Sequence, residues 1–499
     1  MKWANFLHVY QPADQQPDIL NAIIEQSYRP IFSHIASTPN IRLTLNINGA
    51  LLELFDKYGH RDLIDLLRKA GEEGKIEFTG SAKYHAFLPL CTEDDIRRQI
   101  QANTETCLQY LGAKAYKPRG FFPPEMAYKE FLAPIIESFG FEWIILDEIS
   151  ANGSVGTVDY TKIHQIKGSK LKVFFRERRL SNLIMSAVVR SKETLKESMK
   201  DDLASGRYVV TAMDGETFGH HRPGLEQMLF DILDTKDFDL VTISDLLSDK
   251  DYGTVEVSPV ASTWASSKSD IDQGIQFLSW SDPSNMIHTW QWELFHLVRG
   301  EVARMDPKAP AFPQVQKSMD IATASDHFWW ASAKPWWSVE MIEDGAYRLL
   351  ETLRMVPDVS KESMAKASYL YEKIISTAFN WQRTGRIRSM MSEQQSILRI
   401  PFKDRTIGRG GAEEGVYYAF VDMMKDLEKK AAEKGEYEKA ILWRDALYKL
   451  DKKGDIYDTV NAIDLVRVEI PHEEVEKTIE KYKAKYRELR GGQPEQRGS

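Results

Sequence analysis

Two carboxylates follow directly on an apolar run, and their spacing suits proton transfer. Residues 208–212 have the composition of a buried strand, and Asp214 and Glu216 come immediately after them. Side chains two positions apart point to the same side of a strand, so these carboxyl groups should lie close together. Repulsion between them raises one pKa, which is what a general acid needs near neutral pH. Asp214 is therefore the candidate acid. The alternatives are acidic residues in the first turn of a helix and a metal site.

A third carboxylate, Glu125, follows a second short apolar run. Residues 119–122 read as a strand, and Pro123 and Pro124 fix φ and stop it. An amphipathic helix is expected directly afterwards, so Glu125 should lie near a positive helix end that favours its ionised form. An ionised Glu125 facing a protonated Asp214 would form a glycosidase pair. Taken without that pairing, Glu125 would be an ordinary acid in a first helical turn.

Other polar side chains should lie at the same mouth, because most of them also follow predicted strands. They are His8, Gln11, His85, Arg176, Arg178 and His220, together with Glu77 inside the third strand. Arg176 or Arg178 could hold Glu125 ionised through a bidentate contact. A charged Glu77 requires a partner, for which His85 or an arginine is available. The structural alternatives are a hydrogen-bonded core histidine and arginines that bridge surface acids.

Aromatic residues are concentrated in the second half of the chain. Residues 326–337 hold four tryptophans, Trp329 and Trp330 among them, directly after Asp326, and Trp264 lies in a polar, serine-rich loop. Flat aromatic rings bury the apolar C–H face of a sugar well, and large exposed aromatics are a liability unless they bind something. Trp264 is the clearest candidate for a sugar platform. The alternative for the others is a helix end packed on the rest of the protein.

The elements that must position these residues alternate between strand and helix in the first half of the chain. Predicted strands are residues 3–7, 42–46, 76–79, 119–122, 143–146, 172–176, 208–212 and, as an eighth candidate, 240–243. Predicted helices between them are residues 19–35, 62–70, 94–111 and 194–204. Such alternation indicates parallel strands with crossover helices, and a closed β/α barrel brings many strand ends to one face.

The second half reads almost entirely as helix. Predicted helices are residues 284–299, 313–331, 339–356, 361–381, 414–434, 437–452 and 472–489. We therefore expect a β/α barrel at residues 1–255, a helical domain at 256–490 that adds aromatic residues to the cleft, and a disordered tail at 491–499.

Composition excludes several classes of protein. The chain has 499 residues and a net charge of -9, which argues against nucleic acid as a partner. No apolar run is long enough to cross a membrane, and the N-terminus lacks the features of a signal peptide. The only cysteines, Cys91 and Cys107, fit a reducing cytoplasm. No strong metal-binding motif is present, so no cofactor is expected, although His220 and its neighbours keep a metal site open.

These pieces, taken in order, resemble glycoside hydrolase family 57, a family of α-amylases, amylopullulanases and 4-α-glucanotransferases. Five family motifs match residues 8–12, 74–77, 121–126, 213–219 and 326–330. Tyr10 stands where the family's first motif has a second histidine, and Pro123 and Pro124 replace other residues in the third. The resemblance covers roughly residues 1–340. It implies Glu125 as nucleophile and Asp214 as acid/base, in a seven-stranded β/α barrel followed by helices.

The function expected from the sequence is that of a retaining glycosidase or transglycosylase acting on α-glucans through a covalent glycosyl-enzyme. Its partner would be an α-glucan or maltooligosaccharide, and its oligomeric state is unknown. A metal-dependent carbohydrate deacetylase, which also uses Asp and His on a β/α barrel, is the first alternative. A non-catalytic glucan-binding protein that keeps the groove is the second.

Overall fold

The computed structural model describes residues 1–185, 189, 191–249, 252–334, 336–390, 415–452, 463, 465–466 and 469–490. All eight predicted strands are found, within a residue or two at each end. The described strands are β1 (Lys2–Val9), β2 (Leu43–Ile47), β3 (Ile76–Phe78), β4 (Gly120–Phe121), β5 (Trp143–Asp147), β6 (Lys162–Ile166), β7 (Lys172–Arg176), β8 (Tyr208–Asp214), β9 (Asp239–Val241) and β10 (Gly253–Val257). The prediction missed β6 and β10, of which β10 is mostly exposed and lacks an apolar pattern.

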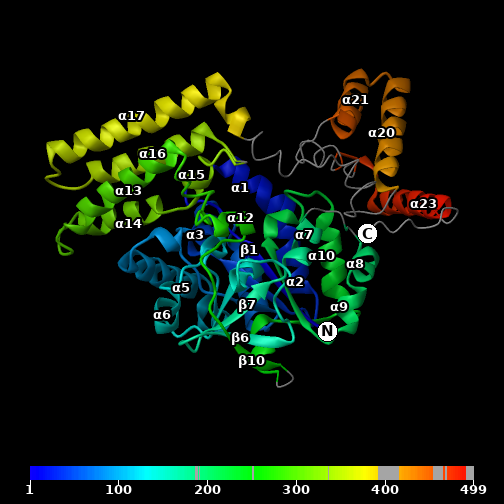
Figure 1. Ribbon diagram of the computed structural model, residues 1–499, viewed down its shortest axis with the longest axis horizontal. Helices are drawn as coiled ribbons and strands as arrows, with labels where there is room; N and C mark the ends of the chain where they lie inside the picture. The colour runs from blue at the N-terminus through cyan, green and yellow to red at the C-terminus, as the bar shows by residue number, and fades with distance from the viewer. Residues whose placement is uncertain are drawn as a thin grey trace.

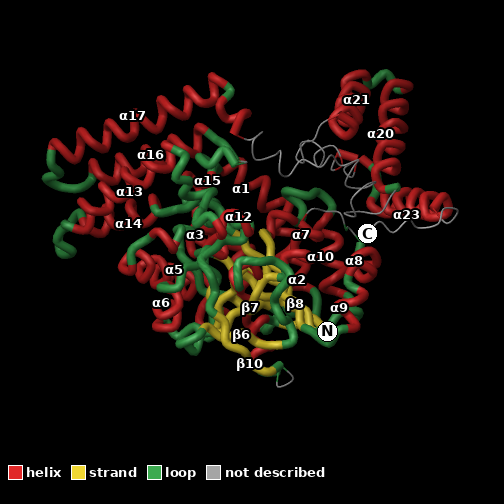
Figure 2. Tube along the Cα trace, in the orientation of Figure 1, coloured by secondary structure: helices red, strands yellow, loops and turns green. Residues whose placement is uncertain are grey.

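The strands form two five-stranded sheets. One has the order β3-β2-β1-β8 with β9 paired to β1, and the other has the order β10-β6-β7-β5-β4. The β6–β7 pair is antiparallel, whereas the other ladders are parallel. Figure 2 shows the strands gathered in the lower centre of the molecule with helices around them. The carboxyl ends of the parallel strands carry the candidate site.

The predicted closed barrel is not observed as a single continuous sheet. At one seam, β3 and β4 are three and two residues long, and only an isolated bridge between Gly80 and Phe121 joins their ends. At the other seam, the backbone of Glu177 donates to the carbonyl of Val210 at 2.8 Å. Beyond that bond, the amide and carbonyl of Ala212 bind the side chains of Ser181 and Arg176 in place of a strand. Both seams therefore lack a ladder.

Helices connect and cover the strands of the first half. Those described there are α1 (Pro17–Ile23), α2 (Arg29–Ser37), α3 (Gly49–Lys57), α4 (Arg61–Glu72), α5 (Glu93–Ala115), α6 (Leu132–Ser138), α7 (Arg178–Met185), α8 (Lys192–Ser198), α9 (Lys200–Ala204), α10 (Leu225–Asp234) and α11 (Ile243–Leu247). A π-helical turn, η1 (Ile24–Tyr28), interrupts the single helix predicted at 19–35. The helices named from the sequence did not include α3, α7, α10 or α11.

The described elements after β10 are helices. They are α12 (Lys268–Asp272), α13 (Met286–Ala303), α14 (Phe312–Ala322), α15 (Asp326–Trp329), α16 (Val339–Arg354), α17 (Lys361–Thr384), α20 (Val416–Glu433), α21 (Tyr437–Lys452) and α23 (His472–Arg490). Figure 1 shows α13 to α17 stacked together, and α20, α21 and α23 grouped near one another. Each group has its own apolar core. The tail predicted at 491–499 lies outside the described residues.

The helix predicted at 313–331 is broken, and the break serves the candidate site. It ends as α14 at Ala322 and resumes as α15 at Asp326. Between them, Ala324 forms an isolated antiparallel bridge with Ala86, and the amide of Ser325 donates to the carbonyl of His85 at 3.1 Å. The start of α15 is thereby fixed against the loop that follows β3. Among the described helices, none has the length and apolar character needed to cross a membrane.

Candidate active site

Glu125 lies in a tight turn whose backbone is held in a rarely populated conformation. Its φ is 63°, within the short 3₁₀ turn Pro124–Met126 that follows β4. Such a left-handed geometry costs about 1–3 kcal/mol for a residue other than glycine and persists only where surrounding contacts enforce it. Trp264 supplies two of these contacts, because its backbone amide donates to the carbonyl of Glu125 at 3.2 Å and its indole Nε1 donates to Oε2 at 2.7 Å.

The predicted helix start at Glu125 is wrong, and so is the ionised state expected from it. The helix α6 begins only at Leu132, so no helix end lies at Glu125. Burial raises the pKa of Glu125 to about 8, and repulsion from Asp214 and Asp326 adds to the rise. The indole of Trp264 acts in the opposite direction, because its hydrogen bond favours the carboxylate. In the free protein Glu125 therefore holds its proton at neutral pH.

Asp214 ends β8 beside His8, its register partner on β1. Burial raises the pKa of Asp214 to about 6, and the positive charge of Arg176 opposes the rise. The sequence predicted a raised pKa here, but it named repulsion by Glu216 as the cause, whereas burial is the main one. Because the pKa of Asp214 lies lower than that of Glu125, Asp214 loses its proton first. This order is the reverse of the one that the glycosidase pair needs.

Glu216 lies next to Asp214 and is held by hydrogen bonds from three residues near the N-terminus. Its Oε1 accepts hydrogen bonds from the Tyr28 hydroxyl, from Nε2 of Gln11 at 3.2 Å and from the amide of Tyr10 at 3.4 Å. Burial, followed by repulsion from Asp214, raises the pKa of Glu216 to about 7. The predicted proximity of Asp214 and Glu216 is thus reflected in their electrostatic coupling.

Arg176 and Arg178 do not hold Glu125, contrary to the expectation. Arg176 Nη1 binds Oδ2 of Asp147 at 2.9 Å, and Arg178 Nη2 binds Oδ1 at 2.7 Å. Asp147 is fully buried at the end of β5, where the two guanidinium groups balance its charge. The sequence reading overlooked Asp147, although its place directly after a predicted strand is the signal that identified Asp214.

Three rings, from the end of β1, the residue after it and the loop that follows β3, form a stacked group beside Glu125. The imidazole of His85 stacks on Tyr10, at 4.2 Å between ring centroids, and on His8, at 5.1 Å, and Tyr10 and His8 lie 6.2 Å from one another. His8 Nδ1 is hydrogen-bonded to Asn46 at 2.7 Å. Burial lowers the pKa of His8 to about 4 and that of His85 also, so both imidazoles are neutral. The Nδ1 atom of His85 lies 3.8 Å from Oε1 of Glu125.

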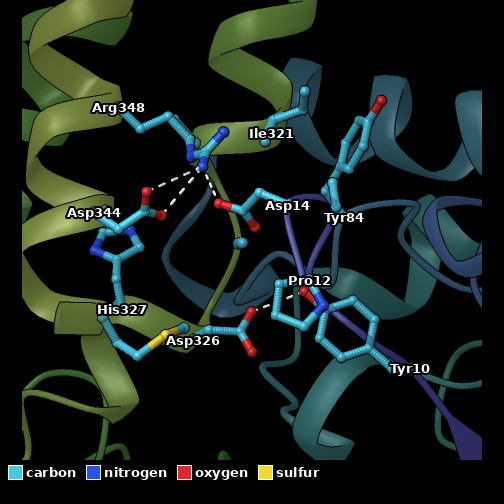
Figure 3. Close-up of a pocket in the computed structure, with 14 residues that line it drawn as sticks. Tyr10, Pro12, Asp14, Tyr84, Ile321, Asp326, His327, Asp344 and Arg348 are labelled. Carbon is cyan, nitrogen blue, oxygen red and sulfur yellow. Dashed lines mark hydrogen bonds and ion pairs between the residues drawn. The ribbon is translucent and has the colours of Figure 1, made fainter. Parts of the chain in front are cut away.

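Asp326 connects this stack to the helical half of the chain. The hydroxyl of Tyr10 donates to Oδ2 of Asp326 at 2.8 Å, as Figure 3 shows. Burial raises the pKa of Asp326 to about 6, and the Tyr10 hydroxyl partly offsets this rise. In the adjacent small pocket, Arg348 of α16 reaches between Asp344 and Asp14 (Figure 3). The tyrosine in place of a second histidine thus binds a carboxylate across the two halves.

Four other predicted residues are not brought to Glu125 by any described contact. Glu77 accepts hydrogen bonds from the hydroxyl of Thr44 and from the amide of Ser244, toward the amino ends of the strands. His220 is bonded to Gln26. Trp329 and Trp330 pack on one another with ring centroids 5.0 Å apart.

The loop between Glu216 and His220 depends on one glycine. Gly219 has φ 101°, and a Cβ there would lie 1.9 Å from the carbonyl oxygen of Gln26. This close approach brings the segment against η1, where His220 binds Gln26. Within the described parts of the chain, no three or more His, Cys, Asp or Glu side chains are arranged to hold a metal ion.

Comparison with known proteins identifies the family of the chain. Residues 5–258 match the profile described as Glycosyl hydrolase family 57. The chain belongs to this family. This confirms the resemblance that the five motifs indicated.

Curated members of family 57 match part of the chain. An α-amylase of Pyrococcus horikoshii is 25% identical over 228 residues, which are 45% of this chain and 35% of the relative. A 4-α-glucanotransferase of Thermococcus kodakarensis is 25% identical over 225 residues, which are 44% of this chain and 34% of the relative. The matched segments thus span about a third of these relatives.

Solved structures of family 57 share the fold. A branching enzyme from Thermococcus kodakaraensis superposes with a TM-score of 0.57 at 14% identity, over 74% of this chain and 94% of that one. A 4-α-glucanotransferase from Thermococcus litoralis gives a TM-score of 0.55 at 18% identity, over 71% of this chain and 58% of that one. At such identities the likeness concerns architecture alone.

Proposed function

We propose that the protein is a retaining enzyme of α-glucans that works through a covalent glycosyl-enzyme. The observation that carries this proposal is that two buried carboxyl groups from different strand ends flank the same pair of histidines. Asp214 is the register partner of His8, whose ring lies 5.1 Å from that of His85, and His85 lies 3.8 Å from Glu125. A carboxylate that attacks and a second carboxyl that transfers protons are the two groups that retaining hydrolysis requires. The names of the relatives, which are amylases, glucanotransferases and a branching enzyme, support α-glucans as substrates.

In the first step Glu125 attacks the anomeric carbon and Asp214 gives its proton to the departing sugar oxygen. A glycosyl ester on Glu125 and a departing chain with a new non-reducing end result. In the second step Asp214 takes a proton from water or from the hydroxyl of another sugar, whose oxygen displaces Glu125. The proton arrangement needed at the start, with Glu125 ionised and Asp214 protonated, is a minority form in the free protein. Neighbouring groups must favour it.

The supporting residues fall into two groups under this proposal. Trp264 and His85 lie against the nucleophile, and Glu216 and Arg176 tune the charge of Asp214. His8 and Gln11 complete the polar wall of the cleft. The barrel-like half at residues 1–255 carries both carboxyl groups, whereas the helical half adds Trp264 and Asp326.

Product analysis tests the function and divides its two forms. The protein is incubated separately with maltoheptaose, amylose and pullulan, and the products are separated by chromatography. Products longer than the starting maltoheptaose mean transfer to sugar acceptors, and exclusively shorter products mean hydrolysis. Release of acetate from acetylated sugars with no change in any glucan would instead support the deacetylase. An unchanged glucan with measurable binding would support a binding protein.

A further inference from the structure

His85 has a hydrogen-bonding capacity beside Glu125 that the free protein leaves unused. Its Nδ1 lies 3.8 Å from Oε1 of Glu125, which is too long for a hydrogen bond. That nitrogen is bonded instead to Oγ of Ser325 at 3.0 Å. The other nitrogen, Nε2, is buried and has no hydrogen-bond partner in the described part of the protein. The side chain is 3% exposed, so water does not satisfy it freely.

Glu125 has one carboxyl oxygen to which none of the described residues donates a hydrogen bond. Its Oε2 receives the indole hydrogen bond of Trp264, but within the described residues nothing donates to Oε1. The charged groups that face it are Asp214 from β8 and Asp326 from α15, and both oppose its ionisation. His8 and Tyr10, which complete its surroundings through the ring stack, are neutral. An N–H directed at Oε1 would therefore stabilise the ionised carboxylate at the oxygen that receives no hydrogen bond.

The imidazole is restrained so that a small movement suffices. It is stacked on Tyr10 and packs beside His8, its backbone has φ 56°, and its carbonyl accepts the Ser325 amide at 3.1 Å. Closing the gap to Glu125 from 3.8 Å to an ordinary N–H···O distance requires a shift of about 1 Å. The ring can turn within its stack, and Ser325 can release Nδ1.

We propose that His85 is the positioning residue of Glu125, and that its Nδ1–H turns from Ser325 to Oε1 of Glu125 as that carboxyl loses its proton. The inference rests on the proposed role of Glu125 as nucleophile. No proton passes to the imidazole, since the carboxyl proton leaves to solvent and Nδ1 keeps its hydrogen. Nε2 remains an acceptor, and a hydroxyl of the substrate that binds it would lock this tautomer.

Three variants test the proposal through the pH dependence of kcat/KM on maltoheptaose. Because Asp214 loses its proton first, the alkaline limb of this profile reports ionisation of Glu125 in the free enzyme. His85→Ala should move this limb up by about one pH unit and reduce kcat by about 10- to 100-fold, the usual effect of losing a hydrogen bond to a charged group. His85→Asn keeps an N–H donor and tolerates the left-handed backbone, so it should restore most of both losses. Ser325→Ala removes the competing acceptor and should move the limb down without reducing kcat.

The opposite results would overturn the role. If His85→Ala lowers kcat while its alkaline limb stays in place, His85 is merely structural. If Ser325→Ala reduces kcat as much as His85→Ala does, the contact with Ser325 is what matters, and the proposed turn is wrong. Thermal unfolding of each variant separates these effects from loss of folding.

A second measurement does not depend on turnover. The pKa of Glu125 is followed by the carboxyl ¹³C signal of glutamate-labelled protein, with the signal identified by its absence in Glu125→Gln. His85→Ala should raise this pKa and Ser325→Ala should lower it, whereas no change in either would refute the inference. A protein that acts on no α-glucan but shows both shifts would refute the proposed function alone.

Discussion

Trp264 donates two hydrogen bonds to Glu125. Its backbone amide donates to the carbonyl oxygen, and its indole Nε1 donates to Oε2 at 2.7 Å. The two contacts hold a left-handed turn and aim the carboxyl group at the same time. The sequence suggested Trp264 as a platform for sugar rings. Its hydrogen bonds add a second role, which is to orient the candidate nucleophile and to favour its charge.

Trp264→Phe should therefore impair ionisation of Glu125 more than substrate binding. The ring remains, but the hydrogen bond to Oε2 is lost, so the alkaline limb of kcat/KM, which reports Glu125, should move to higher pH. We expect kcat/KM at pH 6 to fall by about 10- to 100-fold. Trp292→Phe is the matched control, because its indole binds the carbonyl of Trp280 in the helical core. That variant should lose stability without any shift in the pH profile.

Glu125→Gln should abolish turnover and leave glucan binding nearly intact. The amide keeps the shape of the side chain but cannot form the glycosyl ester. A loss of at least about 1,000-fold in kcat, equal to about 4 kcal/mol of barrier, is expected. Product chromatography gives the rate and calorimetry gives the affinity for maltoheptaose. A variant that keeps a tenth of the wild-type rate would show that another group is the nucleophile.

Asp214→Asn should discriminate between substrates by their leaving groups. Natural glucans need a proton on the departing sugar oxygen, whereas an activated aryl glycoside releases a phenolate unaided. The first step should fall by about 100- to 10,000-fold on glucans and far less on the aryl glycoside. Added azide should restore turnover of the aryl glycoside by attacking the glycosyl-enzyme. Equal losses on both substrates without rescue by azide would move the acid/base role to Glu216.

The raised pKa of Glu125 should also appear in the pH dependence of stability. In the unfolded chain this carboxyl titrates near 4.5, and in the folded protein it titrates near 8. Between these values the folded state binds more protons than the unfolded state, so this group lowers the free energy of unfolding as pH rises. Glu125→Gln removes the effect and should stabilise the protein by about 2–4 kcal/mol at pH 8, and hardly at all near pH 4.5. Thermal unfolding of both proteins across this range checks it. A stability difference independent of pH would contradict the assigned pKa.

The sequence predicted the residues at strand ends better than their partners. Asp214 and His8 lie at one level because each ends a parallel strand, which follows from period and strand order alone. Glu77 differs, because it pairs with Thr44, two residues before the level of Asn46 and His8. A pattern of apolar residues shows that a strand exists but not where along it the cleft begins.

The ionisation of Glu125 was beyond sequence reasoning for another physical reason. Its pKa depends on burial and on which cation comes within reach. Arg176, which ends β7, and Arg178, which follows it, could have paired with Glu125. They bind Asp147 instead, because Asp147 ends β5, the strand next to β7 in the order β7-β5-β4. The left-handed turn at Glu125 also has no signal in a segment without glycine.

The break between α14 and α15 brings residues of the helical half to the candidate site. The site therefore extends beyond the segment that matches the family. The family match stops at residue 258, whereas Trp264, Ser325 and Asp326 all come later in the chain. A chimaera joined at that junction with a relative's C-terminal half would keep both carboxyl groups but exchange Trp264, Ser325 and Asp326, which help to aim and charge them. Homologues that are alike over the first 258 residues can therefore differ in pH optimum and in reaction outcome because of differences in the half that lies beyond the family match.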